Sequence, residues 1–204
     1  MQDLITKRKI DYVWHLTRLS NLDSILQHGL IGREQLEQWD VPPEFNDEYR
    51  FDAQKNAVCC SIGHPNYKMF YRIRVNNSQE EWVVIACKPD ILWEKDCAFC
   101  TENAARNNVT CIPIHLRKGQ QAFERMFDEV EGIPSRADLG LPDDCPTNPQ
   151  AEILVFGNIE PKYIVGAICN SKARETELKE KYPDFEFLYH RSFYSARKDY
   201  EHWK

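Results

Sequence analysis

Short runs of apolar and β-branched residues recur along the chain, separated by segments in which apolar residues repeat with helical spacing. The apolar runs predict strands at 12–17, 57–62, 82–88, 152–156, 163–169 and 185–189. The helical patterns cover 65–74, 119–130 and 172–181. Because the two patterns alternate instead of forming separate blocks, we expect one α+β domain over residues 1–204.

The composition suits a compact enzyme domain. With 42% hydrophobic residues, a chain of 204 residues can bury a sizeable core. Its formal net charge of −6 gives no general attraction to nucleic acid, so a polyanionic partner would need a local cluster of Lys and Arg. The opening MQDLITKRKIDY is polar, and no apolar segment reaches the length of a membrane span. We therefore expect a soluble, cytoplasmic protein with no membrane partner.

The eight cysteines are expected to be free thiols, because the chain shows no secretory signal. Four lie in apolar, strand-like runs and are interpreted as buried small side chains: Cys59, Cys60, Cys87 and Cys169. Cys97 and Cys100 form a CxxC, and Cys111 and His115 follow nearby. That spacing matches no closed zinc site, so no metal is expected.

The first strand places Val13, His15 and Thr17 on one face. A helix capped by Ser20 and ending at Gly29 is expected directly after it. His15 and Thr17 together suit a pocket that binds a carboxamide or a ribose hydroxyl, although a core histidine bonded to backbone explains the same pattern.

Glu152 interrupts an otherwise apolar strand and shares a face with Gln150 and Leu154. Burial of an unpaired carboxylate is costly, so the residue is a candidate for catalysis. The alternative is a glutamate at a strand end that reaches solvent or an arginine. The segment 132–149 is rich in Pro, Gly and Asp and is expected to be the loop that leads into this strand.

Arg50 lies in a long excursion, from 32 to 57, that contains two prolines and many charges. Its planar fork of donors suits a pyrophosphate, but pairing with Asp47 or Glu48 in solvent is equally compatible with the sequence. Neither a glycine-rich phosphate loop nor a GxSxG motif is present, so P-loop, dinucleotide-binding Rossmann and α/β-hydrolase signatures are missing.

The segment 64–74 interleaves aromatic and basic residues, as stacking on bases and binding of phosphates require. If it is helical, part of this stripe must instead face the core. A second mixed cluster spans 189–198. The candidates for nucleic-acid contact are Tyr67, Lys68, Tyr71, Arg72 and Arg74.

Four segments, in this order along the chain, resemble the DarT family of nucleic-acid ADP-ribosyltransferase toxins. They are YVWHLTRLSNLDSILQHGL, NAVCCSIGHPNYKMFYR, WVVIACKPDILWEKDCAFCTENAARN and PTNPQAEILVFG. The strand-helix opening and the QAE strand are the most specific of them. The resemblance implies an ADP-ribosyltransferase fold, in which a split, twisted, mixed or antiparallel sheet flanked by helices binds NAD as the ADP-ribose donor.

The resemblance also implies roles for single residues. Glu152 and Arg50 would be catalytic, Arg50 by contact with the phosphates. The NAD site would be formed by His15, Thr17, Asn21, Leu22 and Arg50.

The implied acceptor is a base of single-stranded DNA, stacked on Tyr67, Phe70 or Tyr71. Thymine-modifying members carry a histidine after the strand and loop that correspond to 96–107, and this stretch contains none, which favours guanine. A separately encoded antitoxin that removes ADP-ribose is the expected partner. RNA or protein as acceptor, and a non-catalytic NAD-binding module, are the alternatives.

Overall fold

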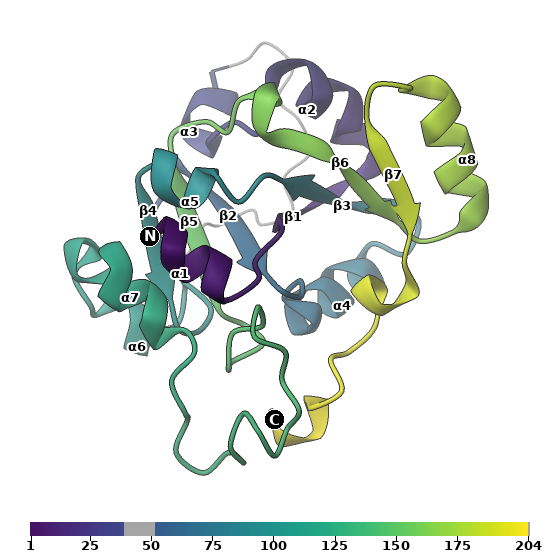
Figure 1. Ribbon diagram of the computed structural model, residues 1–204. Coiled ribbons are helices and arrows are strands. Elements are labelled where there is room, and N and C mark those ends of the chain that lie inside the picture. The colour runs from purple at the N-terminus through teal and green to yellow at the C-terminus, as the bar shows by residue number, and fades with distance from the viewer. Residues whose placement is uncertain (39–51, 204) are drawn as a thin grey trace.

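The computed structural model describes residues 1–38 and 52–203. Within them, seven strands form one sheet in the order β4-β5-β2-β1-β3-β6-β7 (Figure 1). The strands are β1 Val13–Arg18, β2 Ala57–Ile62, β3 Trp82–Cys87, β4 Cys97–Cys100, β5 Glu152–Phe156, β6 Ile164–Cys169 and β7 Glu186–Tyr189. Neighbours are antiparallel except β6 and β7, which are parallel.

Helices surround this sheet (Figure 1). The α-helices are α1 Gln2–Lys7, α2 Leu22–His28, α3 Arg33–Leu36, α4 Tyr67–Asn76, α5 Ile91–Glu94, α6 Asn107–Thr110, α7 Gly119–Arg125 and α8 Lys172–Lys181. Short 3₁₀ turns are η1 Leu19–Asn21, η2 Ile114–Arg117, η3 Pro161–Tyr163, η4 Arg191–Tyr194 and η5 Tyr200–His202. No helix among the described residues is long and apolar enough to span a membrane.

The sheet is split between β1 and β2. Strand β1 pairs with β3 at six residue positions, from Val13 opposite Cys87 to Arg18 opposite Trp82. It pairs with β2 at only two, Val13 opposite Ile62 and Trp14 opposite Ser61. Beyond Trp14 the two strands diverge, which opens a gap between a β4-β5-β2 half and a β1-β3-β6-β7 half.

The core lies on both faces of the sheet. On one face the buried cluster includes Val13, Ile85 and Ile153, and on the other α4 inserts Phe70 against Trp82. Phe70 and Ile85 are each 0% exposed, so α4 is fixed by core packing.

Most of the predicted elements are present, and those over 57–62, 152–156 and 172–181 have the predicted bounds. The apolar pattern did not predict strand β4, although the family resemblance refers to a strand and loop over 96–107. The first helix begins at Leu22, after a 3₁₀ turn that contains Ser20, so Ser20 is not its cap. It ends at Gly29, where φ is +86° and a Cβ would lie 2.2 Å from the carbonyl oxygen of Ile159, so only glycine fits.

Candidate active site

A cavity of about 210 Å³ opens where β1 and β2 diverge. Its walls carry side chains from both half-sheets, from η1 and α4, and from the turn after β4. They include His15, Thr17, Asn21, Met69, Asn103 and Glu152. The predicted catalytic carboxylate and three of the predicted NAD-site residues therefore line one cavity.

Glu152 is 5% exposed, and neutral amides hold both of its carboxylate oxygens. Oε1 accepts hydrogen bonds from Nδ2 of Asn66 at 3.2 Å and from Nδ2 of Asn103 at 2.9 Å. Oε2 accepts one from the backbone amide of Ala104 at 2.9 Å. These donors offset part of the cost of burial and fix the orientation of the carboxylate.

Local structure holds both asparagines in place. Asn66 is the N-cap of α4, where its Oδ1 accepts from the amide of Met69 at 3.2 Å. Asn103 lies in the turn after β4, and its Oδ1 accepts from the amide of Ala105 at 3.1 Å. The sequence analysis identified neither residue, although an Asn before an apolar helical pattern is a recognisable cap signal for Asn66.

The opposite wall comes from β1 and η1. Nδ1 of His15 donates to the carbonyl oxygen of Cys59 at 2.9 Å, so in the neutral ring Nε2 is an acceptor. Nδ2 of Asn21 donates to Oγ1 of Thr17 at 3.2 Å. Thr17 is 2% exposed, so this hydroxyl is held at the base of the wall.

Of the other two predicted NAD-site residues, Leu22 is not among the residues that line the cavity. Leu22 is 1% exposed and belongs to the main core cluster, so its side chain is a packing residue at the start of α2. Arg50 lies outside the described residues 1–38 and 52–203.

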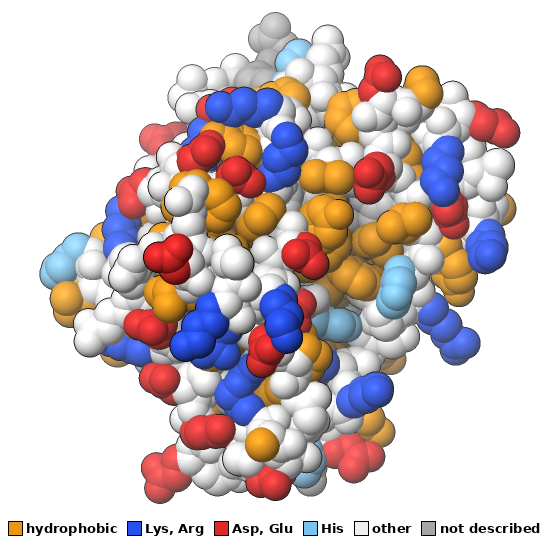
Figure 2. Space-filling model, in the orientation of Figure 1, with side chains coloured by type: hydrophobic (Ala, Val, Ile, Leu, Met, Phe, Trp, Pro, Cys, Tyr) orange, Lys and Arg blue, Asp and Glu red, His pale blue; other side chains and the backbone are white. Residues whose placement is uncertain are grey.

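Helix α4 separates the predicted nucleic-acid contacts into two groups. Tyr71 is 64% exposed, Arg72 is exposed and Lys68 is half-buried. Met69 and Ile73 of the same helix line the cavity, so Lys68 and Arg72 stand beside it. Over the face shown in Figure 2, basic and acidic side chains are intermingled, which limits electrostatic attraction of DNA to such local groups.

In the second group, two aromatic residues are buried and Arg74 is half-buried. Phe70 is 0% exposed and Tyr67 is 9% exposed, so the prediction that a base stacks on Phe70 is wrong, and Tyr67 offers little ring surface. The guanidinium of Arg74 donates to the carbonyl oxygen of Tyr194 at 2.7 Å and lies 4.5 Å from the Phe70 ring centroid. Burial lowers the pKa of Arg74. Arg74 therefore packs against Phe70 and η4, and its contact with DNA stays a prediction.

The CxxC lies on β4 and is buried. Sγ of Cys97 donates to the carbonyl oxygen of Ile91 at 3.4 Å. Burial raises the pKa of Cys97 to about 12 and that of Cys100 to about 11, so both are neutral thiols. Within the described ranges, no three His, Cys, Asp or Glu side chains are grouped to hold a metal ion.

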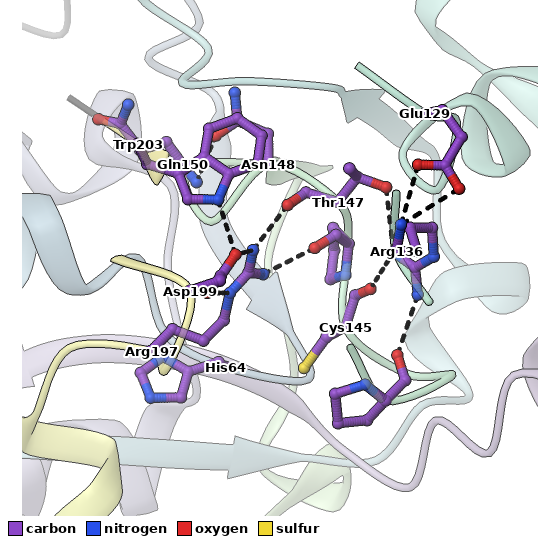
Figure 3. Close-up of polar contacts among 12 residues, drawn as sticks. His64, Glu129, Arg136, Cys145, Thr147, Asn148, Gln150, Arg197, Asp199 and Trp203 are labelled. Carbon is purple, nitrogen blue, oxygen red and sulfur yellow. Dashed lines mark hydrogen bonds and ion pairs between the residues drawn. The ribbon is translucent and has the colours of Figure 1, made fainter. Parts of the chain in front are cut away.

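The loop that leads to Glu152 is anchored by the C-terminal segment, which runs beside it (Figures 1 and 3). The Arg197 guanidinium donates to the carbonyl oxygens of Pro146 at 2.7 Å and Thr147 at 2.6 Å. It also forms two hydrogen bonds with the Asp199 carboxylate, at 2.6 and 2.5 Å. Nε1 of Trp203 donates to the same carboxylate at 2.6 Å.

A second arginine holds this loop from within. The Arg136 guanidinium donates to the carbonyl oxygens of Cys145 at 2.8 Å and Pro142 at 3.0 Å, and to Oγ1 of Thr147 at 3.0 Å. The segment 132–149 has no helix or strand, as predicted, and hydrogen bonds from two arginines order it immediately before β5.

Comparison with known proteins identifies the family from the sequence and the fold from solved structures. The sequence model described as "ssDNA thymidine ADP-ribosyltransferase, DarT" matches residues 14–195. No curated protein matches the sequence.

Three solved structures are similar. Thermosipho africanus DarTG in complex with ADP-ribose has a TM-score of 0.64 at 15% identity, over 90% of this chain and 51% of that one. Thermus sp. 2.9 DarT in complex with carba-NAD+ has a TM-score of 0.61 at 14% identity, over 92% of this chain and 99% of that one. The same Thermus protein in complex with ADP-ribosylated ssDNA has a TM-score of 0.57 at 13% identity, over 92% of this chain and 97% of that one. The chain thus spans about half of the Thermosipho chain, and the predicted ADP-ribosyltransferase fold is confirmed.

Proposed function

The chain belongs to the DarT family of single-stranded DNA ADP-ribosyltransferases, and from this premise we propose that it transfers ADP-ribose from NAD to guanine in single-stranded DNA. One observation carries the proposal. The buried Glu152 carboxylate and the His15 and Thr17 side chains line one cavity at the split of the sheet. NAD is the donor substrate.

In the proposed complex, the nicotinamide end of NAD lies against β1. The Thr17 hydroxyl and the His15 imidazole supply both donors and acceptors, which a carboxamide and a ribose hydroxyl require. Asn21 donates a hydrogen bond to the Thr17 hydroxyl and so fixes its orientation in the same wall. Arg50 completes the proposed site by contact with the phosphates.

Glu152 acts on both substrates. The bond between nicotinamide and ribose C1 breaks, and nicotinamide leaves with the electron pair. The positive charge that develops on the sugar is stabilised by the fixed Glu152 carboxylate. A base nitrogen then attacks C1, and Glu152 accepts the proton that this nitrogen loses.

A single-stranded acceptor suits the surface beside the cavity. An unpaired base reaches a buried carboxylate without being extruded from a duplex. Lys68 and Arg72 lie on α4 next to the cavity and are placed to bind backbone phosphates, and Tyr71 offers an exposed ring for stacking.

The choice of guanine rests on the turn after β4. Asn103 and Ala104 contact Glu152 there, and the stretch 96–107 lacks the histidine expected of thymine-modifying members. The family description names thymidine, so the base is the sharpest point to test.

The test uses single-stranded DNA oligonucleotides in which either guanine or thymine is absent, incubated with the protein and NAD and analysed by mass spectrometry. We expect an added mass of one ADP-ribose only on strands that contain guanine. Modification of thymine strands alone would overturn the choice of base. Modification of RNA or of protein instead of DNA would overturn the acceptor class. If no nicotinamide is released, the chain is a binding module and not an enzyme.

The role of Glu152 is tested with a matched pair of variants. Glu152→Gln is expected to lower transfer by about 10³-fold, because it loses both the negative charge and the proton acceptor. Glu160→Gln removes an exposed carboxylate shortly after the same strand and should keep full activity. An active Glu152→Gln protein with unchanged thermal unfolding would contradict the mechanism.

We further propose that the enzyme acts as a toxin in the cytoplasm, together with a separately encoded partner that removes ADP-ribose from DNA. Expression of the chain with and without such a hydrolase checks this, with growth and DNA-bound ADP-ribose as the measurements.

A further inference from the structure

Arg117, at the end of η2, is buried without a charged partner. Its side chain is 6% exposed, and its Nε has no hydrogen-bond partner. One terminal nitrogen donates to Sγ of Cys100 at 3.6 Å. No carboxylate in ranges 1–38 and 52–203 forms an ion pair with it. A buried guanidinium with only a neutral thiol beside it is costly unless an anion joins it.

A second cavity, of about 430 Å³, lies against this guanidinium. Its walls also include the polar side chains of Asn107 and Thr110, both exposed on α6. The Asn107 amide and the Arg117 guanidinium are donors that suit phosphate oxygens. The Thr110 hydroxyl donates to the carbonyl oxygen of Asn107 at 3.3 Å and adds a polar surface beside them.

This cavity adjoins the catalytic one. Asp52 and Ala105 line both. Cys100, which contacts Arg117, pairs directly with Glu152 across β4 and β5, so the two side chains lie on the same face of the sheet. Arg117 is therefore one strand further from the split than the catalytic carboxylate, and Figure 1 shows β4, α6 and α7 together at this edge.

We propose that the Arg117 cavity binds a backbone phosphate of the DNA strand, one that flanks the base presented to Glu152. This rests on the proposed function. A phosphate held here would fix the register of the strand, so that only one nucleotide reaches the catalytic cavity.

The Asp52 carboxylate determines on which side of the cavity the phosphate binds. Asp52 shares the wall, and its Oδ1 accepts from the amide of Gln54 at 3.3 Å. Because a carboxylate repels an anion, the phosphate binds on the side formed by Arg117, Asn107 and Thr110.

The experiment replaces backbone phosphates one at a time. Oligonucleotides with a single target base carry one neutral methylphosphonate linkage at successive positions, and kcat/KM for transfer is measured with wild type and with Arg117→Gln. In wild type, one linkage near the target should lower kcat/KM by about 10-fold, as loss of a charge-assisted contact does. The Arg117→Gln variant should show the same fall in kcat/KM on the oligonucleotide that keeps all its phosphates. A neutral linkage at the sensitive position should then cause no further fall in that variant.

Lys118→Gln is the matched control. It removes one positive charge from the next residue, but Lys118 is paired with Asp96, so the sensitive linkage should stay sensitive. Arg117→Lys keeps the charge and should keep part of the effect. The Arg117→Lys and Lys118→Gln variants and the scan of wild type test the phosphate contact even if Arg117→Gln is too unstable to assay.

The remaining outcomes separate the sources of phosphate. Hydrolysis of NAD without DNA should have the same KM in wild type and Arg117→Gln, whereas a raised KM for NAD would assign the cavity to the donor and overturn the proposal. A scan of wild type in which no linkage matters would also overturn it. If wild type modifies no oligonucleotide at all, it is the proposed function that fails.

Discussion

Two buried arginines, Arg197 and Arg117, have nearly the same exposure, 8% and 6%, but very different surroundings. Arg197 binds a carboxylate and two carbonyl oxygens in the cluster of Figure 3. Arg117 has a thiol at 3.6 Å and a cavity. A buried charge whose partners are all supplied by the chain stabilises the fold. One whose partner must come from outside indicates a binding site.

The largest expected effect is on stability, and it separates the two arginines directly. Arg197→Met leaves Asp199 buried without its cation, which should cost about 3–5 kcal/mol. Arg117→Met removes a charge that lacks a protein counter-charge and should change stability by less than about 1 kcal/mol in either direction. For a chain of this size, the first variant should melt about 6 °C or more below wild type in calorimetry. Equal losses in both variants would refute the distinction between the two arginines.

The next effect concerns the amides that hold Glu152. Asn103→Ala should lower kcat by about 10- to 100-fold with little change in KM for NAD, because the carboxylate loses its orientation while the NAD wall is intact. Asn66→Ala should do the same and also destabilise the protein by about 1 kcal/mol, because α4 loses its cap.

Asn108→Ala provides the control for these amides. Its Nδ2 donates to Glu102 at 2.9 Å outside the cavity, so kcat should be unchanged. A rise in KM without a fall in kcat for Asn103→Ala would show that the residue binds substrate and does not position Glu152.

A smaller effect distinguishes cations on the two sides of α4. Lys68→Gln and Arg72→Gln should each reduce the salt dependence of DNA binding, by about 0.7 in the slope of log affinity against log salt concentration. Arg74→Gln should leave that slope unchanged and lower the melting temperature, because its donor binds a backbone carbonyl. Fluorescence anisotropy at several salt concentrations measures the first effect.

The smallest expected effect is a pH dependence at His64, beside the Arg197 cluster. Burial lowers the pKa of His64 and outweighs the carbonyl oxygens of Pro65 and Ser192, which favour the charged ring. The unfolded chain therefore binds the proton more readily than the folded one. The contribution of neutral His64 to the free energy of unfolding is complete above pH of about 6.5 and is lost as pH falls through the lowered pKa of the folded state. His64→Gln should flatten urea-unfolding stability between about pH 7 and 5 relative to wild type. Parallel curves would assign the acid sensitivity to other groups.

The fold was predictable wherever local pattern is strong. Long apolar runs indicated β2 and β5 with their observed bounds, since burial on both faces requires such runs. Strand β4 has only four residues, Cys97–Cys100, and its identity depends on pairing with β5 more than fifty residues later in the chain. A run that short carries no usable periodicity.

The site was predictable at single positions but not in its supporting contacts. His15, Thr17 and Glu152 interrupt strands, which makes them visible in sequence. Asn66 and Asn103 lie 86 and 49 residues from Glu152, and only the fold brings them to its carboxylate.

Helical phase explains the wrong prediction at Phe70 on α4. Phe70 and Arg74 are four residues apart and lie on one face, which the core occupies, whereas Lys68 and Arg72 lie on another. The alternation of aromatic and basic residues indicated the composition of the helix but not which members would remain exposed.

The weak junction between β1 and β2 has a consequence for how such an enzyme can diversify. Two ladder pairs and the hydrogen bond from His15 to Cys59 join the half that carries His15 and Thr17 to the half that carries Glu152 and the turn after β4. The turn after β4 and strand β1 lie on separate halves, so effects of substitutions in them should be nearly additive. We therefore expect that acceptor preference can be re-engineered in the β4-β5 half, by exchange of the turn alone, without loss of affinity for NAD.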